Sequence, residues 1–268
     1  MSLRKKSQYW KNFVVSKISN SDIHIIAIIP ARGGSKSVPR KNLQDLGGFP
    51  LISYTIESAL RSNLIQEVYV STEDSEIADI SSSYGAKIIQ RPDSMATDTS
   101  RDDELLINAI ENEFTALDHQ SLIVFLRPSH PLRNPATIDT AIDTYLSTPG
   151  YDSLRSMKLS SEIPYKMWRI GEEGYAIPVT ENHSIGVSDP CNAPRQVLPK
   201  TYYQDGYVDV FPFSTVLNFS NTAGGKVLPF IIDEFSHDID TFQDLEIINA
   251  RLDTAPWPSW FKNPKLLS

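Results

Sequence analysis

Four basic side chains lie close together in one short stretch of the sequence, residues 32–42, and no acidic residue separates them. They are Arg32, Lys36, Arg40 and Lys41. A lysine neutralises a phosphate as a point charge, and an arginine offers two parallel N–H donors. The stretch lacks the Gly-Lys-Ser/Thr ending of a P-loop and the spaced glycines of a dinucleotide site. It therefore predicts a polyphosphate-binding loop of another kind, which we call the basic loop.

Two adjacent glycines, Gly33 and Gly34, lie near the start of the basic loop. Because glycine has no Cβ, it lets backbone N–H groups approach an anion closely. A glycine turn with solvated cations is the alternative interpretation. The apolar run that directly precedes the loop, residues 25–29, favours phosphate binding, because anion sites commonly follow a strand in this way.

Two carboxylates near the end of the chain form the second candidate site. Asp238 and Asp240 alternate with Ile239, so in an extended segment both carboxylates project to one side, about 7 Å apart along the chain. Mg²⁺ suits such a pair, because it commonly takes one or two carboxylates and leaves its other positions to water and substrate phosphates. Two surface carboxylates, or carboxylates that cap a helix, would give the same sequence pattern. The basic loop in the same chain favours the metal site over these alternatives.

The composition excludes several classes of protein. A formal net charge of −8 over 268 residues argues against a general nucleic-acid surface. Cys191 is the only cysteine, so an intramolecular disulfide is impossible and a zinc cluster is not indicated. No run approaches the roughly 20 apolar residues of a membrane span. We expect a cytoplasmic protein, with residues 1–22 as an N-terminal extension that is mobile or contacts a partner.

Short apolar runs alternate with helical patterns along the first half of the chain. Such alternation predicts a mainly parallel sheet covered on both faces, with ligands at the carboxyl ends of the strands. One helix has a clear start, with Asn134 as N-cap and Pro135 in the first turn. The expected strands are 25–29, 68–71, 87–90 and 122–126, and the other expected helices are 51–62, 76–84 and one around 105–110.

The alternation stops at about residue 159 and resumes at about 206. Prolines punctuate this stretch, so we interpret it as an insertion in a single domain that covers residues 23–268. Beyond it we expect strands at 207–211 and 227–232. A final helix begins near Thr241, where an acidic residue three positions later completes a capping-box pattern.

Several short motifs occur in the order seen in one enzyme family. The chain resembles the acylneuraminate cytidylyltransferases, also called CMP-sialic acid synthetases, through ARGGSK, PRKN, VSTED, RPDSMATDT, LRPSHPLR, PRQVLPKTY and HDIDT. The resemblance covers roughly residues 25–252. It implies a three-layer Rossmann-like α/β nucleotidyltransferase fold, in which the insertion at about 159–206 is a dimerisation arm. It also implies Mg²⁺-dependent transfer of CMP from CTP to the anomeric hydroxyl of an acidic 2-keto-3-deoxy nonulosonate, with release of pyrophosphate.

The resemblance assigns roles to individual residues. Arg32, Lys36 and Lys41 would act in catalysis, and Asp238 and Asp240 would bind Mg²⁺. The nucleotide would be bound by Arg32, Gly33, Gly34, Ser35, Lys36, Lys41, Asn42 and Arg91. The sugar would be bound by Arg127, Lys166, Arg195 and Gln196, where Lys166 and Arg195 come from the neighbouring subunit of a homodimer, with a tetramer as an open alternative.

Four positions depart from the family pattern. Ser37 follows Ser-Lys where the family often has glycine, and a positive φ at that position would strain a serine. Arg127 stands where many members have glutamine, and as an extra fixed cation it would favour a more acidic or differently N-acylated sugar, such as a legionaminic-type nonulosonate. His130 replaces a common serine and is either a base for the sugar hydroxyl or a structural hydrogen-bonding group. Asp102 replaces a small polar residue that the family often has near the nucleotide base.

Two alternative functions stay open. One is an enzyme of the same fold for an eight-carbon ketosugar acid, and the other is a non-catalytic nucleotide-binding regulatory subunit.

Overall fold

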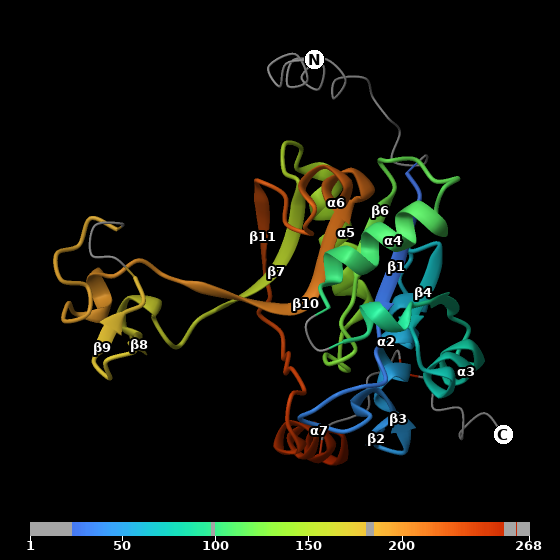
Figure 1. Ribbon diagram of the computed structural model, residues 1–268, viewed down its shortest axis with the longest axis horizontal. Helices are drawn as coiled ribbons and strands as arrows, with labels where there is room; N and C mark the ends of the chain where they lie inside the picture. Colours follow the sequence, from blue (N-terminus) through green and yellow to red (C-terminus); the bar gives the residue numbers. More distant parts are fainter. Residues whose placement is uncertain (1–22, 98–99, 181–184, 255–260, 262–268) are drawn as a thin grey trace.

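A seven-stranded, mostly parallel sheet forms the centre of the protein (Figure 1). The computed structural model describes residues 23–97, 100–180, 185–254 and 261, so the expected extension at 1–22 lies outside it. The strand order is β11-β7-β10-β6-β1-β4-β5. The strands are β1 (Ile25–Pro30), β4 (Glu67–Thr72), β5 (Lys87–Gln90), β6 (Leu122–Phe125), β7 (Ser153–Leu159), β10 (Tyr202–Pro212) and β11 (Val227–Ile231).

The four strands expected in the first half of the chain are confirmed to within a residue or two. β1 pairs in parallel with both β4 and β6, and β4 pairs in parallel with β5. β1 and β6 are buried on both faces, which explains why they read as continuous apolar runs. The chain passes from β1 to β4 on one side and returns to β6 on the other, so β1 and β6 flank the point where the strand order reverses.

Helices cover the two faces of the sheet and complete three layers. One apolar cluster joins α2, α3 and α5 to the sheet, and a second joins α4 and α6 to its opposite face. The helices are α2 (Leu51–Leu60), α3 (Ser75–Ser83), α4 (Asp102–Asn112), α5 (Pro135–Ser147), α6 (Phe213–Phe219) and α7 (Phe242–Thr254). No helix in the described part of the chain is both long enough and apolar enough to span a membrane.

The expected helix ends are confirmed. The Asn134 side chain accepts a hydrogen bond from the backbone N–H of Ala136 at the start of α5. At the start of α7, Thr241 and Asp244 exchange hydrogen bonds in a capping box. α7 packs with the small hairpin β2–β3 (Asp45–Leu46 and Phe49–Pro50) in a third apolar cluster.

β10 is antiparallel to both of its neighbours, β6 and β7. Neither β7 nor the first half of β10 was expected from the sequence. The two strands extend beyond the sheet as a ribbon and carry residues 160–180 and 185–201, which we call the arm (Figure 1). The arm contains the short hairpin β8–β9 (Trp168–Ile170 and Ala176–Pro178). Its exposed apolar side chains are Met167, Trp168, Ile170, Tyr175, Val179 and Val197.

Candidate active site

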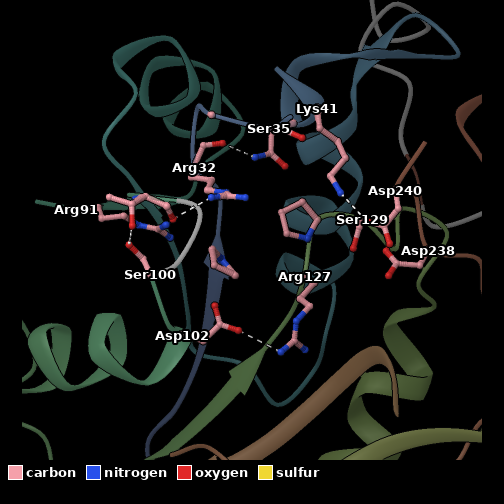
Figure 2. Close-up of a pocket in the computed structure, with 15 residues that line it drawn as sticks. Arg32, Ser35, Lys41, Arg91, Ser100, Asp102, Arg127, Ser129, Asp238 and Asp240 are labelled. Atoms are coloured by element: carbon pink, nitrogen blue, oxygen red, sulfur yellow. Dashed lines mark hydrogen bonds and ion pairs between the residues drawn. The ribbon is translucent and has the colours of Figure 1, made fainter. Parts of the chain in front are cut away.

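A polar pocket of about 370 Å³ lies at the carboxyl ends of the parallel strands (Figure 2). Arg32 follows β1, Arg91 follows β5 and Arg127 follows β6, so three strands of the parallel part of the sheet each deliver one arginine to it. The C-terminal segment with Asp238 and Asp240 supplies another wall. The lining residues are Pro30, Arg32, Gly34, Ser35, Lys41, Asn42, Arg91, Thr97, Ser100, Asp102, Arg127, Pro128, Ser129, Asp238 and Asp240.

The basic loop contributes to the pocket through only some of its residues. The loop residues that line the pocket are Arg32, Gly34, Ser35, Lys41 and Asn42. The buried Asn42 side chain donates a hydrogen bond to the Arg32 backbone oxygen at 3.0 Å, which ties the two ends of the loop together. Asn42 is therefore placed to hold the loop's shape.

Gly33 lies outside the pocket lining. Its backbone N–H donates to Glu73 Oε1 at 2.7 Å, and an added Cβ would lie 2.5 Å from Asp74 Oδ2. Gly33 therefore serves close packing against the start of α3. Lys36 also does not line the pocket, and Arg40 points to Asp74 at 3.0 Å from a left-handed backbone conformation with φ of 52°.

Arg32 and Arg91 are both fixed by backbone oxygens. Arg32 Nη1 donates to the oxygen of Thr97 at 2.9 Å, and Arg91 Nη2 donates to the oxygen of Ser71 at 3.1 Å. Burial lowers the pKa of Arg91, and the nearby Glu73 carboxylate opposes this shift. In the described structure Arg91 Nε is buried without a hydrogen-bond partner. Because an unsatisfied buried donor is costly, a ligand acceptor near Arg91 would be favoured.

The two aspartates face the pocket as their spacing predicts. Between them the Ile239 side chain is fully buried against α7, and its backbone N–H donates to the oxygen of Ser129 at 2.9 Å. Lys41 Nζ donates to the oxygen of Ile239 at 2.7 Å and lies 3.1 Å from Asp240 Oδ1. Lys41 thus links the basic loop directly to the carboxylate segment.

This wall suits a divalent cation. Burial raises the pKa of Asp238, and the neighbouring Asp240 carboxylate adds to that shift. A cation bound between the two would relieve their repulsion, and their hard oxygens are the ligands that Mg²⁺ prefers. Among the described residues no group of three or more His, Cys, Asp or Glu side chains could hold a metal. The pair therefore fits a metal that takes its remaining ligands from substrate phosphates and water.

Arg127 is held between two carboxylates. Its Nη1 lies 3.1 Å from Asp209 Oδ2, and its Nη2 lies 3.2 Å from Asp102 Oδ2. Burial alone would lower the pKa of Arg127, but these carboxylates outweigh burial and raise it. The sequence suggested an extra fixed cation at this position. The structure corrects that view, because two carboxylates compensate the charge and one of them, Asp102, is itself a departure from the family pattern.

The comparisons with known proteins agree with this geometry. The family model described as cytidylyltransferase matches residues 26–169. A pseudaminic acid cytidylyltransferase from Campylobacter jejuni is 32% identical over 234 residues, which are 82% of this chain and 93% of that protein. This chain belongs to the cytidylyltransferase family.

Other relatives are named for different sugars. An N-acylneuraminate cytidylyltransferase from Escherichia coli is 30% identical over 83% of this chain and 51% of that protein. A CMP-N,N'-diacetyllegionaminic acid synthase from Legionella pneumophila is 39% identical over 47% of this chain and 55% of that protein. The matched region is thus about half of the length of these two relatives.

Solved structures support the nucleotidyltransferase fold. A CMP:2-keto-3-deoxy-manno-octonic acid synthetase complexed with CTP is similar with a TM-score of 0.64 and 18% identity, over 86% of this chain and 99% of that chain. A 4-diphosphocytidyl-2C-methyl-D-erythritol synthase from Anaerococcus prevotii has a TM-score of 0.58 and 15% identity, with the same coverage. The three-layer α/β fold expected from the sequence is therefore confirmed.

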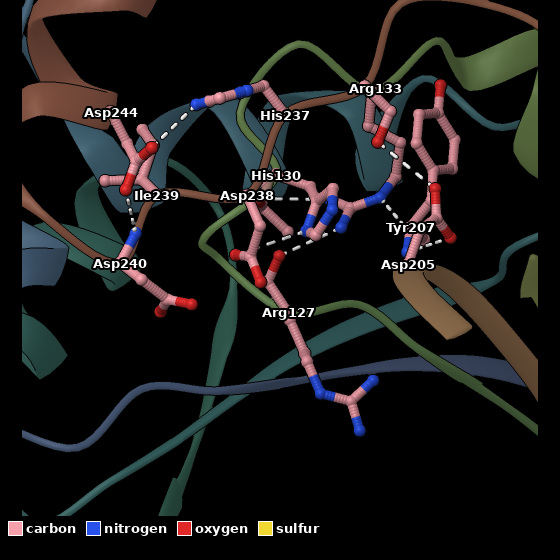
Figure 3. Close-up of polar contacts among 12 residues, drawn as sticks. Arg127, His130, Arg133, Asp205, Tyr207, His237, Asp238, Ile239, Asp240 and Asp244 are labelled. Atoms are coloured by element: carbon pink, nitrogen blue, oxygen red, sulfur yellow. Dashed lines mark hydrogen bonds and ion pairs between the residues drawn. The ribbon is translucent and has the colours of Figure 1, made fainter. Parts of the chain in front are cut away.

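His130 of this cytidylyltransferase lies behind the pocket wall (Figure 3). It is 3% exposed, and its Nδ1 atom is 3.7 Å from Asp238 Oδ1 without a hydrogen-bond partner in the described structure. Burial and the nearby cations Arg133 and Arg127 lower the pKa of His130 to about 2. The imidazole is therefore neutral near pH 7, and Asp238 separates it from the pocket.

Two residues that shape this part of the cytidylyltransferase were not singled out in the sequence. Arg133 is fully buried and donates to the backbone oxygens of Arg127, at 2.9 Å, and Tyr207. Ser129 lines the pocket and hydrogen-bonds to the Asp238 side chain. Both lie in the LRPSHPLR motif, which was the one available signal for them.

The remaining sugar-binding candidates of the cytidylyltransferase, Lys166, Arg195 and Gln196, lie in the arm and outside the pocket lining. Lys166 Nζ donates to the oxygen of Cys191 at 3.2 Å, and Arg195 Nη2 donates to the oxygen of Ser161 at 2.8 Å. A single chain therefore does not bring them to the pocket.

Proposed function

We propose that this enzyme transfers CMP from CTP to the anomeric hydroxyl of an acidic nonulosonate sugar and releases pyrophosphate. The observation that carries the proposal is a single pocket in which Ser35 and Lys41 of the basic loop face the carboxylates of Asp238 and Asp240. Relatives named for pseudaminic, N-acylneuraminic and diacetyllegionaminic acids support this class of sugar.

The residue types suit attack on the α-phosphorus of CTP. Negative charge then grows on the phosphoryl oxygens and on the departing pyrophosphate. Hydrogen bonds to backbone oxygens hold the side chains of Arg32 and Lys41 in the pocket, where they would bind the triphosphate and stabilise that charge. No residue of the pocket needs to form a covalent intermediate, because the sugar hydroxyl is the nucleophile. The direction of attack is set by where the sugar binds relative to the basic loop.

We propose Mg²⁺ as the cofactor and Asp238 with Asp240 as its protein ligands. When bound, the ion would neutralise phosphate charge and polarise the reacting phosphoryl group. Lys41 lies 3.1 Å from Asp240 Oδ1, and its ammonium group would be available to contact phosphate oxygens if that carboxylate held the ion. The donor set supports this assignment, because it consists of two carboxylates that repel each other.

We propose that the enzyme acts as a homodimer through the arm. The exposed apolar side chains of the arm, such as Trp168 and Ile170, would be covered by a second copy. Lys166, Arg195 and Gln196 would then reach the sugar in the partner's pocket. The single cysteine and a CTP substrate fit a cytoplasmic location.

The first test is pyrophosphate release from CTP with four sugars supplied separately: N-acetylneuraminate, a legionaminic-type sugar, pseudaminic acid and an eight-carbon ketosugar acid. We expect release with at least one nine-carbon sugar, only when Mg²⁺ is present, and loss of turnover in Asp240→Ala. Release only with the eight-carbon sugar would replace the proposed substrate class. If no pyrophosphate is released with any of the four sugars although CTP binds, a non-catalytic nucleotide-binding subunit would be favoured.

A further inference from the structure

A buried carboxylate lies directly behind the Arg127 side chain. Asp209 is 0% exposed and does not line the pocket, whereas Arg127 does. The two side chains meet at 3.1 Å although 82 positions separate them in the sequence. On its pocket side Arg127 is held by Asp102, at the first turn of α4. Two of the five guanidinium N–H groups are thus used to fix the group, and the others remain for a substrate acceptor.

Asp209 is itself fixed by residues at the base of the arm. Gln204 Nε2 donates to Asp209 Oδ2 at 3.1 Å, and Gln204 Oε1 accepts from Arg155 Nη1 at 2.6 Å. Arg155 Nη2 in turn donates to Thr222 Oγ1 at 2.5 Å. A continuous polar chain therefore runs from β7 through β10 to the pocket.

An irregularity in β10 makes this chain possible. The register between β10 and β7 shifts between Gln204 and Asp209, which is the mark of a β-bulge. Gly206 lies inside the shift with φ of 75°, a conformation that favours glycine. The bulge lets Gln204 and Asp209, five positions apart, contact each other and place Asp209 under Arg127.

We propose that Asp209 is a positioning residue that orients Arg127 for the sugar substrate. Because the carboxyl groups of Asp209 and Asp102 both accept hydrogen bonds from its guanidinium, Arg127 offers directed N–H donors rather than an unpaired positive charge. It would therefore recognise an uncharged oxygen of the sugar, such as an amide carbonyl or a hydroxyl, rather than the sugar carboxylate. This inference rests on the proposed function for the identity of the substrate, and the position of Arg127 can be tested without it.

The kinetic test is a double-mutant cycle of Asp209→Asn and Arg127→Gln. Losing a hydrogen bond to a charged group costs about tenfold or more in binding, so each single variant should raise the KM for the sugar about tenfold, with the KM for CTP within about twofold of wild type. The double variant should be no worse than Arg127→Gln, because Asp209 then has nothing to orient. Additive losses, or an unchanged sugar KM in folded Asp209→Asn, would overturn the proposal.

The double variant also guards against a folding artefact. Asp209→Asn alone leaves a partly buried arginine with one carboxylate fewer, whereas the double variant replaces the ion pair with two neutral amides. If Asp209→Asn fails to fold, the comparison of the double variant with Arg127→Gln still decides the question. Asp152→Asn is the matched control, because Asp152 accepts from the backbone of Gly225 and Lys226 and does not line the pocket. It should lower stability without changing the sugar KM.

A measurement independent of turnover separates this inference from the proposed function. The guanidinium signals of Arg127 in an NMR spectrum can be assigned by their absence in Arg127→Gln. In the wild-type protein they should show slow rotation of the guanidinium, and in Asp209→Asn they should merge through fast rotation. Slow rotation in the wild-type protein that becomes fast in Asp209→Asn, with no activity toward any sugar, would reject the proposed function and retain Asp209 as the positioning residue, whereas slow rotation that persists in Asp209→Asn would reject the positioning role. Fast rotation in the wild-type protein would reject the positioning role.

Discussion

Two neighbouring glycines of the basic loop have different structural requirements. At Gly33 a side chain would collide with the N-cap residue of α3, because an added Cβ would lie 2.5 Å from Asp74 Oδ2. At Gly34 an added Cβ meets no atom within 4 Å. Although both were assigned to phosphate binding, only Gly34 lines the pocket.

We therefore expect Gly33→Ala and Gly34→Ala to behave differently. Gly33→Ala must displace Asp74 from the α3 cap, which is worth about 1 kcal/mol, and shift the loop that carries Arg32 and Lys41. The kcat/KM for CTP should fall by about tenfold or more. Steady-state kinetics with the preferred sugar held at saturation would measure this.

Gly34→Ala serves as the control at the adjacent position, and its CTP kinetics should stay within a few fold of wild type. Equal effects of the two substitutions would mean that the contact between Gly33 and Asp74 does not control the loop. In that case the glycines would matter for their flexibility alone.

Charged residues that directly follow a strand could be predicted from the sequence, and those inside the sheet could not. Arg32 and Arg91 come within two residues of the ends of β1 and β5, and both line the pocket. Asp209 lies within the apolar run of β10, where a lone carboxylate gives no sign of its partner. Arg133 directly precedes the N-cap residue Asn134, and its position in the sequence does not indicate burial. Its partners, such as Thr55, lie far away in the sequence.

At the scale of single elements, the start of α7 controls where the carboxylate segment ends. Asp244 accepts hydrogen bonds from the backbone N–H groups of Asp240 and Thr241 at 3.1 and 2.8 Å, and from His237 at 2.8 Å (Figure 3). These donors lower the pKa of Asp244 to about 2, with the Thr241 side chain as the largest cause. One side chain therefore fixes both the helix start and the backbone of a metal-ligand candidate.

The low pKa predicts how stability depends on pH. In the unfolded chain an aspartate titrates near pH 4, so the stabilisation by Asp244 is fully present above about pH 4 and is lost as the pH falls toward 2. At pH 7 Asp244→Asn should be less stable than wild type by about 1 kcal/mol, the size of a helix-cap contribution. Urea unfolding at several pH values would show that the difference in unfolding free energy between Asp244→Asn and wild type shrinks below pH 4.

Glu246→Gln is the control for this experiment, because Glu246 is an exposed acid in the same helix. Its unfolding free energy should follow that of the wild-type protein across the pH range. If the difference for Asp244→Asn stays constant down to pH 2, the capping carboxylate is not the group that titrates.

β7 was not predicted from the sequence for a physical reason. β7 reads SLRSMKL, with a basic residue at positions 155 and 158, so it lacks the continuous apolar run of the strands that were predicted. In the folded protein Arg155 hydrogen-bonds to Gln204 and Thr222, and Lys158 donates to the backbone oxygens of Glu234 and Ser236. Those acceptors come from segments 49 to 78 positions away, so tertiary structure alone makes β7 a good strand.

At the scale of the whole molecule, the pocket and the arm lie in different parts of one chain. Lys41 lies in the pocket and Arg195 lies in the arm, so a dimer that joins the two would contain sites built from both chains. This arrangement predicts complementation between variants that are each inactive.

Mixing Arg195→Ala with Lys41→Ala should restore activity after subunit exchange. In the mixed dimer, the pocket of the Arg195→Ala chain keeps Lys41 and receives Arg195 from its partner. With random pairing of equal amounts, about half of the dimers are mixed and one of their two sites is intact, so about one quarter of wild-type activity should return. Pyrophosphate release before and after exchange measures the recovery.

A mixture of Lys41→Ala with Asp240→Ala is the matched control. Both residues line the same pocket within one chain, so neither pocket of the mixed dimer is complete and activity should stay absent. Recovery in the control would point to residual activity of a single variant. No recovery in the first mixture, with exchange shown by mass spectrometry, would reject a shared site.

The place of β10 in the sheet has a consequence for how the chain folds as the ribosome makes it. β1, β4, β5 and β6 pair only among themselves or with β10, so they can assemble once residue 125 has emerged. β7 has no neighbour but β10 and β11, and both are translated after the arm. The nascent chain must therefore hold an unpaired strand while the exposed apolar arm is still being synthesised, a state in which a chaperone is most useful. Of the residues that line the pocket, Asp238 and Asp240 are translated last, so the pocket is complete only after residue 240 has emerged.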